Sequence, residues 1–504
     1  MNHKLRPVML AGTGSDVGKS VLATALCRIF LQDGYHPAPF KAQNMALNSF
    51  ATPEGYEIGR AQAVQAEAAG IPCHTDMNPL LLKPQADHTS QVILNGRPIG
   101  QRDAYDYFRR SEQHDRLRAE VCAAFDRLAA RHNPIVMEGA GSICELNLMD
   151  TDLVNMPMAR YADARVVLVA DIDRGGVFAS AYGSIMLQSP EDRTRICGII
   201  VNKFRGDLRL FDEGRRILQR ICGVPVLGVV PAFTDIHVDG EDSVALERKR
   251  KHGQTVTTKP EWQVAAAVVQ LPHISNYTDF DRLENDPRLR LFYTDQPGEL
   301  TRADIILLPG TKTTLDDLRW LQANGCAAAI QEAHRRGAVV VGICGGYQMM
   351  GRLVEDPQGI EGKSTCLAGL GLLPTRTVMT EQKVTLQRSF RLAEGGRTLC
   401  KGYEIHQGRT ESFGTCAPVA VMEDGTEEGT RMDERTWGTY LHGFFDNDEA
   451  VELLLLPFDS RLAPNSESLS IPDYQEWKNQ QYDRLADHVR RYIDLQCLYR
   501  LLQE

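Results

Sequence analysis

Residues 339–348 read VVVGICGGYQ, an apolar run that ends abruptly in a small-residue turn and continues as a helical pattern. This layout predicts a nucleophile elbow, in which a strand leads into a tight turn that lifts one reactive side chain above a sheet. Cys344 is that side chain, and the glycines around it permit the unusual backbone angles that the turn needs. The backbone N–H of Gly345 is then placed to meet a developing oxyanion.

A second loop lies near the N-terminus, where residues 12–20 read GTGSDVGKS between an apolar strand and a helical pattern. In a nucleotide site, backbone N–H groups of such a loop hold phosphate, a lysine neutralises the outer phosphates and a hydroxyl reaches Mg²⁺. Lys19 and Ser20 fit the last two roles. The loop departs from the strict GxxxxGK[ST] pattern because Thr13, and not a glycine, lies five residues before Gly18. We expect an ATP site formed by Gly12, Thr13, Gly14, Asp16, Val17, Gly18, Lys19 and Ser20.

The size and charge of the chain limit its function. With 504 residues it is too long for one hydrophobic core, so about two or three domains are expected. The net charge of −10 argues against nucleic acid or an anionic membrane as the main partner. No stretch approaches the roughly 20 apolar residues that span a bilayer, and the phosphate loop begins too early to leave room for a signal peptide. We therefore expect a cytoplasmic protein.

The twelve cysteines show no paired CxxC spacing, which argues against structural zinc and against a disulfide framework.

Short apolar runs alternate with helical patterns in the first half of the chain. A helix is predicted at 19–32, and strands are predicted at 7–11, 134–137, 165–170, 197–201 and 224–229. Near-continuous apolar strands separated by helices indicate a parallel sheet that is covered on both faces.

A second α/β pattern follows a polar, charged stretch at 239–261, which is the predicted linker. A late strand ends near His442, and earlier strands are expected at 264–269, 304–308 and 338–343. The predicted fold class is therefore α/β with two domains, each a mostly parallel sheet covered by helices. The expected domains are 1–238 with the phosphate loop, 262–450 with the thiol, and 451–504 as a helical extension packed on the second domain.

Several polar side chains follow predicted strands, where the carboxyl ends of a parallel sheet form a crevice. Glu138 ends one strand and is expected to bind the metal together with Ser20. Asn202 ends another strand and is expected to offer its amide to the nucleotide base; the alternative is a plain turn residue. Three residues are expected to contact the substrate: Lys41, Asn44 and Asp173. Lys41 is expected to meet a carboxylate of the substrate.

A thiol attacks as thiolate, so Cys344 needs a base or a positive field. His442 is the predicted base because it follows a short apolar strand and precedes a glycine. A packed strand-end histidine is the alternative interpretation of His442, and His406, in a similar strand-like setting, is the rival base. The turn after the strand at 304–308 contains Gly310, whose N–H is the second oxyanion candidate.

These motifs resemble known families. Residues 12–20 resemble the phosphate loop of dethiobiotin synthetases, and residues 342–348 with 440–443 resemble class I glutamine amidotransferases. Their presence together in one chain resembles the cobyrinate amidase group. Within this group, three further segments are similar to the cobyric acid synthases, namely 40–49, 171–176 and 271–281.

The resemblance implies a P-loop NTPase-like domain that binds ATP and a corrinoid, followed by a class I glutamine amidotransferase-like domain. The implied reaction is amidation of the b, d, e and g carboxylates of adenosylcobyrinic acid a,c-diamide in cobalamin biosynthesis. It implies ATP and Mg²⁺, an acyl phosphate of the substrate, and L-glutamine as the ammonia source through a thioester on Cys344. The chain has Phe444 where the wider amidotransferases have a glutamate, so a Cys344–His442 dyad is expected. Whether Glu404 or another residue orients His442 is left open.

Two other functions fit parts of the sequence. A cobyrinic acid a,c-diamide synthase shares both domains, but residues 41–49 and 275–281 favour amidation at the b, d, e and g positions. A P-loop switch ATPase with a partner-binding second domain belongs to a different class, and it leaves the elbow and His442 without a purpose. ATP-dependent release of glutamate from glutamine separates the enzymes from the switch.

Overall fold

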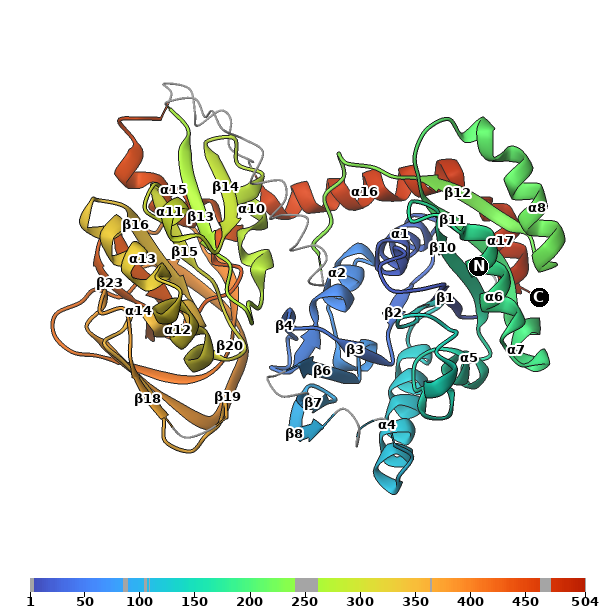
Figure 1. Ribbon diagram of the computed structural model, residues 1–504, viewed down its shortest axis with the longest axis horizontal. Coiled ribbons are helices and arrows are strands. Elements are labelled where there is room, and N and C mark those ends of the chain that lie inside the picture. The colour runs from blue at the N-terminus through green and yellow to red at the C-terminus, as the bar shows by residue number, and fades with distance from the viewer. Residues whose placement is uncertain are drawn as a thin grey trace. The chain divides into compact units, whose positions relative to one another are not determined.

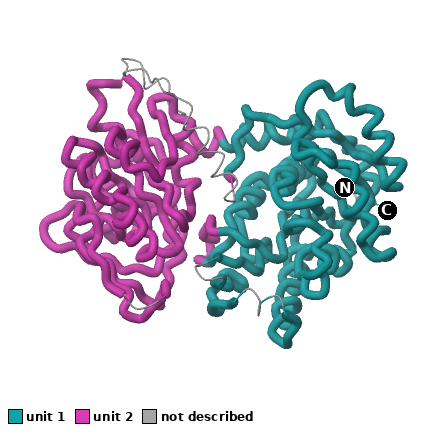
Figure 2. The backbone as a smooth tube through the Cα atoms, in the orientation of Figure 1, with its two compact units in different colours: residues 1–46, 56–239, 478–504 teal, residues 47–55, 240–477 magenta. Residues whose placement is uncertain are grey.

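The computed structural model describes residues 4–84, 89–103, 107, 109–240, 262–362, 365–462 and 473–503. Within these residues the chain forms two compact units, which Figure 2 shows in different colours. Unit 1 is built from residues within 1–46, 56–239 and 478–504, and unit 2 from residues within 47–55 and 240–477. None of the described helices is long and apolar enough to cross a membrane.

Unit 1 is organised around a parallel sheet in the order β12-β11-β10-β1-β9-β2 (Figure 1). Its strands are β1 Val8–Gly12, β2 Ala38–Phe40, β9 Ile135–Glu138, β10 Arg165–Asp171, β11 Ile196–Phe204 and β12 Val226–Pro231. Most of their side chains are buried, as expected for parallel strands covered by helices. The helices are α1 Lys19–Gln32, α2 Arg60–Ala68, α4 Glu112–Ala129, α5 Met156–Tyr161, α6 Val177–Met186, α7 Pro190–Arg195 and α8 Asp212–Cys222. Short 3₁₀ turns are η1 Thr75–Met77, η2 Leu146–Thr151 and η3 Leu208–Phe211.

A smaller sheet also belongs to unit 1. Its order is β3-β6-β7-β8, with β3 parallel to β6 and the other pairs antiparallel. The strands are β3 Gln43–Met45, β6 Leu80–Pro84, β7 Thr89–Leu94 and β8 Arg97–Asp103. The short strand β5 Glu57–Gly59 leads directly into α2, so the N-terminal end of that helix lies next to the buried residues of this region.

The C-terminal helices α16 Tyr474–Tyr492 and α17 Leu495–Gln503 belong largely to unit 1. Leu485, Val489 and Leu502 share one hydrophobic cluster with side chains of β1 and α1. The expectation that the C-terminal extension packs on the second domain is therefore wrong for the residues from 478 onward. An apolar helical face shows that a helix must be covered, but it does not show which domain covers it.

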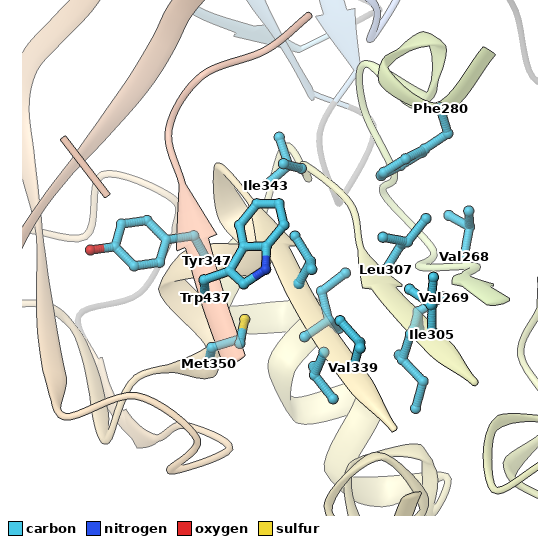
Figure 3. Packing of buried hydrophobic residues seen from close by; sticks show 14 of the residues in the cluster. Val268, Val269, Phe280, Ile305, Leu307, Val339, Ile343, Tyr347, Met350 and Trp437 are labelled. Carbon is cyan, nitrogen blue, oxygen red and sulfur yellow. The ribbon is translucent and has the colours of Figure 1, made fainter. Parts of the chain in front are cut away.

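Unit 2 contains a second, mostly parallel sheet in the order β14-β13-β15-β16-β24-β23, in which only the β23–β24 pair is antiparallel among the described pairs. Its strands are β13 Val264–Val269, β14 Leu289–Thr294, β15 Ile305–Leu308, β16 Val339–Ile343, β23 Thr430–Asp433 and β24 Thr436–Thr439. Figure 3 shows Val268, Leu307, Val339 and Trp437 packed in its core. The helices are η4 Tyr277–Phe280, α10 Asp281–Glu284, α11 Pro297–Leu300, α12 Thr314–Ala323, α13 Cys326–Arg335, α14 Gly345–Met350, η5 Phe444–Asp446, α15 Asp448–Leu455 and η6 Leu456–Phe458.

A further sheet of unit 2 has the order β18-β17-β19-β21-β22, with β20 paired to β19. Its strands are β17 Leu353–Asp356, β18 Thr365–Ala368, β19 Thr375–Leu392, β20 Cys400–Ser412, β21 Ala420–Met422 and β22 Glu427–Glu428. The short strand β4 Ser49–Ala51 also belongs to unit 2, where Gln387 Nε2 donates a hydrogen bond to the Ala51 carbonyl at 2.8 Å. The sequence did not indicate that residues 47–55 leave the first domain.

The predicted fold class is confirmed, because both units are α/β and the main sheet of each is mostly parallel. The predicted helix at 19–32 and strand at 264–269 have the observed bounds, and the other predicted strands differ only by a few residues at their ends. Most of the predicted linker, from 241 to 261, lies outside the described residues.

Candidate active sites

The predicted nucleophile elbow forms between β16 and α14. Cys344 has φ 51° and ψ −108°, a conformation of a kind that costs a non-glycine residue roughly 1 to 3 kcal/mol and clusters at functional sites. Glycines make the turn possible. A Cβ on Gly342 would lie 2.5 Å from Tyr347 N, and a Cβ on Gly346 would lie 2.0 Å from Leu308 O. Cys344 is therefore held in a strained turn at the end of a buried strand.

His442 lies beside Cys344, shortly after β24. Its Nδ1 hydrogen-bonds to Asp279 Oδ2 at 2.7 Å, and its imidazole lies close enough to the Cys344 sulfur for that sulfur to raise its pKa. The Cys344 thiol itself donates a hydrogen bond to the Ile405 carbonyl at 3.6 Å. The other carboxylate oxygen of Asp279 accepts a hydrogen bond from the backbone N–H of Gly443 at 2.9 Å. All three side chains are buried, with exposed fractions of 7% for Cys344, 1% for His442 and 3% for Asp279. The structure places a thiol, an imidazole and a carboxylate in series.

The surroundings of His442 favour its charged form. Burial disfavours the imidazolium, but the adjacent Asp279 carboxylate, its hydrogen bond to Nδ1 and the nearby Cys344 sulfur outweigh burial and raise the pKa of His442 to about 10. An imidazolium next to a thiol stabilises the thiolate, which is the form that attacks carbon.

His406, the rival base, has different partners. Its ring stacks on the Tyr440 ring with centroids 3.8 Å apart, and its Nδ1 hydrogen-bonds to the Gly408 carbonyl at 2.9 Å. Burial lowers the pKa of His406, and the opposing effects of Glu404 and the Gly408 hydrogen bond are smaller. The histidine whose pKa the Cys344 sulfur raises is therefore His442, whereas His406 is occupied by Tyr440 and the Gly408 carbonyl.

Neither Glu404 nor Phe444, which occupies the usual glutamate position, provides the carboxylate that hydrogen-bonds to His442. Glu404 Oε2 accepts a hydrogen bond from Arg388 Nε at 2.8 Å. Phe444, at the usual glutamate position, is 1% exposed and packs in the core of unit 2. The carboxylate at His442 is that of Asp279 in η4. Asp279 lies in the segment 271–281 that resembles the cobyric acid synthases, but no spacing in the sequence connects it to His442.

The two oxyanion candidates lie on turns that meet near this pair. A Cβ on Gly310 would lie 3.2 Å from His442 Cε1, and a Cβ on Gly345 would lie 2.6 Å from Thr311 Cγ2. The turn after β15 therefore contacts both the imidazole and the turn that carries Cys344. A side chain at either glycine would intrude on this arrangement.

The phosphate loop lies between β1 and α1 in unit 1. Lys19 Nζ donates hydrogen bonds to the carbonyl oxygens of Gly14 and Gly141, each at 2.9 Å. A Cβ on Gly12 would lie 2.7 Å from Lys19 Nζ, and Gly18 has a φ of 96°, so both positions require glycine. The loop therefore holds the Lys19 ammonium over its own backbone.

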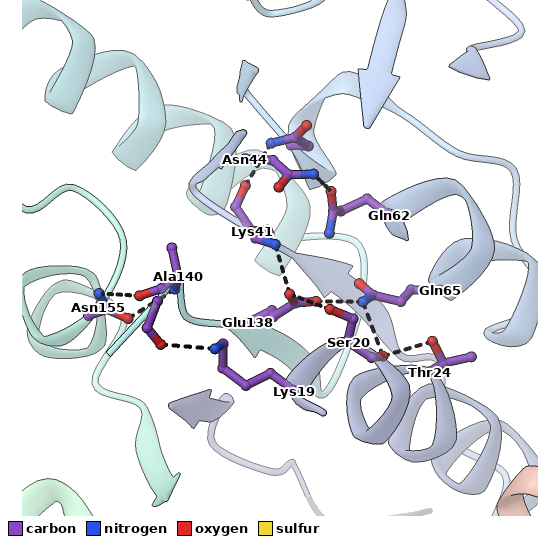
Figure 4. A network of polar contacts seen from close by, with 12 residues as sticks. Lys19, Ser20, Thr24, Lys41, Asn44, Gln62, Gln65, Glu138, Ala140 and Asn155 are labelled. Carbon is purple, nitrogen blue, oxygen red and sulfur yellow. Dashed lines mark hydrogen bonds and ion pairs between the residues drawn. The ribbon is translucent and has the colours of Figure 1, made fainter. Parts of the chain in front are cut away.

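Glu138 is the centre of the polar network in Figure 4. Its Oε1 accepts hydrogen bonds from Ser20 Oγ and Lys41 Nζ, both at 2.8 Å, and its Oε2 accepts one from Gln65 Nε2 at 2.7 Å. Burial alone would raise the pKa of this carboxyl, but the Lys41 charge and the three hydrogen bonds lower it. The structure brings Ser20, Lys41 and an ionised Glu138 together, and Lys41 is buried instead of solvated.

Asn202 and Asp16 both lie at the phosphate loop. Asn202 Nδ2 donates a hydrogen bond to the Val17 carbonyl at 2.9 Å, so its amide lies against the loop. Asp16 has a φ of 56° and forms an ion pair with Lys203 at 3.3 Å. Two consecutive side chains near the C-terminal end of β11, Asn202 and Lys203, thus hold the loop in place.

The proposed substrate contacts Asn44 and Asp173 have protein partners of their own. Asn44 is buried, and its Nδ2 donates a hydrogen bond to Gln62 Oε1 at 3.1 Å. Asp173 is exposed enough to meet solvent and pairs with Arg205 Nε at 2.8 Å. Asn44 and Asp173 therefore each contact a different protein side chain.

Two family models match the chain. Residues 8–243 match the CobQ/CobB/MinD/ParA nucleotide binding domain, and residues 265–450 match the CobB/CobQ-like glutamine amidotransferase domain. The first match contains the phosphate loop and Glu138, and the second contains Cys344, His442 and Asp279.

Relatives that span the whole chain are also found. The chain is 60% identical to the cobyric acid synthase of Phocaeicola vulgatus, with 100% of this chain and 99% of that relative covered. This chain belongs to the cobyric acid synthase family. Other members are the cobyric acid synthases of Parabacteroides distasonis, 53% identical with 99% of each chain covered, and Citrobacter koseri, 45% identical with 99% of this chain and 98% of that relative covered. Membership of the cobyric acid synthase family confirms the resemblance seen in the sequence, and it makes the chain an amidotransferase ligase with a nucleotide-binding domain.

Proposed function

We propose that the chain catalyses the ATP- and glutamine-dependent amidation of the b, d, e and g carboxylates of adenosylcobyrinic acid a,c-diamide. The observation that carries the proposal is the buried contact between Cys344 and His442 in a chain 60% identical, over its full length, to a cobyric acid synthase. A thiol with an adjacent imidazole is suited to release ammonia from glutamine. A phosphate loop is suited to activate a carboxylate with ATP.

In the glutamine site, Cys344 is the proposed nucleophile and His442 its base. His442 Nε2 takes the thiol proton, and Cys344 Sγ attacks the side-chain amide carbon of glutamine. The N–H groups of Gly345 and Gly310 are proposed to donate hydrogen bonds to the oxyanion. His442 returns the proton to the leaving nitrogen, so ammonia departs and the glutamyl group remains on Cys344 as a thioester. Water that loses a proton to His442 then attacks the thioester, glutamate leaves, and the proton returns to the sulfur.

In unit 1, the loop with Lys19 is the proposed ATP site, and Ser20 and Glu138 are the proposed Mg²⁺ ligands. Ser20 Oγ and Glu138 Oε1 lie 2.8 Å apart, and hard oxygen donors of this kind suit Mg²⁺. The bound ion would neutralise charge on the outer phosphates. Gly12 leaves the space beside Lys19 Nζ that a Cβ would fill, which fits a loop that must close around phosphate.

Lys41 is proposed to hold the substrate carboxylate that is activated. Its Nζ lies 2.8 Å from Glu138 Oε1, next to the proposed metal ligands. A carboxylate oxygen of the substrate attacks the terminal phosphorus of ATP, ADP leaves, and an acyl phosphate forms. Ammonia then attacks the acyl carbon, phosphate leaves, and the nitrogen loses a proton to give the amide. Asn202 is proposed to contact the nucleotide base, and Asn44 and Asp173 to contact the corrinoid.

We also propose a cytoplasmic location. All twelve cysteines lie within the described residues, and each is free of a disulfide bond. Free cysteines of this number fit a reducing compartment.

Mass spectrometry of the corrinoid products tests the proposed function. The protein is incubated with adenosylcobyrinic acid a,c-diamide, glutamine and MgATP. A final product with amides at the b, d, e and g positions supports the proposal. Amidation of cobyrinic acid at the a and c positions alone would identify the sister synthase, and ATP hydrolysis without amidation would identify a switch ATPase. Either of these results refutes the proposal.

A further inference from the structure

We propose that Asp279 positions His442 and completes a Cys344–His442–Asp279 triad in the glutamine site. This inference rests on the proposed glutaminase role of unit 2. Both carboxylate oxygens of Asp279 are bonded at His442 and Gly443, so Asp279 acts through the imidazole. It replaces the carboxylate that the wider amidotransferases carry two residues after the histidine, where this chain has Phe444.

The first evidence is that both oxygens of Asp279 are used at this one place. Oδ2 lies 2.7 Å from His442 Nδ1, and Oδ1 accepts the backbone N–H of Gly443 at 2.9 Å. A carboxylate held at two points on consecutive residues cannot rotate without breaking one of the bonds. Asp279 and His442 are 3% and 1% exposed, so water does not compete for either hydrogen bond. The imidazole therefore has one preferred orientation.

The second evidence is that the backbone around Asp279 is shaped to deliver the carboxylate. Asn276 has a φ of 52°, a conformation that asparagine tolerates better than most residues. Its carbonyl accepts the N–H of Asp279 at 3.0 Å, and its side-chain oxygen accepts the N–H of Ser49 at 2.8 Å. The next residue, Phe280, is fully buried in the core of unit 2. The residues before and after Asp279 in the chain thus both hold it in place.

The third evidence comes from the other groups that face the ring. The Tyr403 ring stacks on the imidazole with centroids 5.2 Å apart, and Tyr403 exchanges two backbone hydrogen bonds with His442 at 2.8 and 3.0 Å. The pKa of His406, on the same strand β20, is lowered by burial and also by the nearby His442, while Cys344 raises the pKa of His442. Asp279 is the carboxylate that hydrogen-bonds to the imidazole, since Glu404 is paired with Arg388.

This arrangement selects the form of histidine that the reaction needs. A carboxylate only accepts hydrogen bonds, so it requires the proton of a neutral His442 to be on Nδ1. Nε2 is then the nitrogen with a free lone pair, which can take the thiol proton of Cys344. When the imidazolium forms, the buried charge of Asp279 stabilises it. Asp279 therefore selects the tautomer of neutral His442 and also stabilises the imidazolium.

Asp279→Asn tests the inference with little change of shape. The amide oxygen can still accept the N–H of Gly443, but the amide NH₂ now faces Nδ1 and favours the opposite tautomer. Glutamate release from glutamine should fall by a factor of about 10² to 10⁴. Amidation driven by ammonium should persist, because it does not use this site. Glu404→Gln, the same kind of change at the neighbouring carboxylate, should leave glutamate release unchanged.

A pH profile separates a positioning role from a structural one. The probe is 6-diazo-5-oxo-L-norleucine, a glutamine analogue whose covalent attachment to Cys344 is followed by mass spectrometry. Asp279 stabilises the imidazolium that accompanies the thiolate, so its loss should move the alkylation profile to higher pH. The expected shift is about 1 to 3 pH units, the usual effect of one close opposite charge. The Glu404→Gln profile should coincide with that of the unchanged protein.

Two results would overturn the triad. One is an Asp279→Asn variant that releases glutamate at the original rate. The other is a slower variant whose pH profile has not moved, because Asp279 would then support the fold and not the base. If the unchanged protein releases no glutamate from glutamine, the proposed function itself fails, and this outcome is separate from the other two.

Discussion

Replacing Gly346 with alanine should damage the glutamine site although Gly346 has no proposed role in the chemistry. An ideal Cβ at this position lies 2.0 Å from the Leu308 carbonyl oxygen and 2.5 Å from its carbon. Both are backbone atoms of β15, which is paired with β13 and β16, so they cannot turn aside as a side chain would. Real Cβ atoms essentially never approach closer than 3.0 Å. The added methyl group must therefore push α14 and β15 apart by about 1 Å, the scale at which overpacking is felt.

The expected magnitude follows from this shift. Forcing one extra carbon into a packed site typically costs about 1 to 3 kcal/mol of unfolding free energy. A displacement of about 1 Å near a reacting group can cost on the order of 10²-fold in rate. Because α14 begins directly after Cys344, we expect Gly346→Ala to lower glutamate release by about that factor. Ammonium-driven amidation should continue.

The assay compares glutamate release, ammonium-driven amidation and thermal unfolding of the variant. Gly298→Ala, in α11 of the same unit, is the matched control, since no heavy atom lies within 4 Å of its added Cβ. The control should behave as the unchanged protein in all three measurements. If Gly346→Ala releases glutamate at the original rate, the close approach of α14 to β15 does not determine the position of Cys344. The expected loss of activity is then refuted.

Three further substitutions test the assigned roles. Cys344→Ser should abolish glutamine-driven amidation while high ammonium still supports synthesis; normal use of glutamine would mean that another residue is the nucleophile. Lys19→Ala should remove synthesis with glutamine and with ammonium alike, because carboxylate activation precedes both, and ammonium-dependent product from this variant would place the ATP site elsewhere. His442→Ala should slow glutaminase turnover by about 10² to 10⁴, and His406→Ala should act more weakly. A larger loss of Cys344 alkylation in His406→Ala than in His442→Ala would reverse the two assignments.

Much of this protein can be predicted from its sequence because the signals are local. The elbow around Cys344 depends on a strand, a turn and a helix that follow one another within ten residues, and the phosphate loop at 12–20 does likewise. The helix at 19–32 and the strand at 264–269 carry their own apolar patterns and have the bounds that these patterns predict. Such features need only the neighbours in the chain.

Only the tertiary structure could show which distant residues meet. Asp279 reaches His442 across 163 positions because η4 packs against η5, which follows His442, and Lys41 reaches Glu138 across 97 because β2 lies beside β9. His442 comes close to Cys344 because β24 lies beside β16. The helices after residue 478 carry an apolar face that fits against either domain in kind, and the structure packs them on unit 1. The physical reason is the same in each case. An apolar pattern shows that a side chain must be buried, and a polar residue shows that it needs a hydrogen-bond partner. Strand order and packing decide which residue provides that contact.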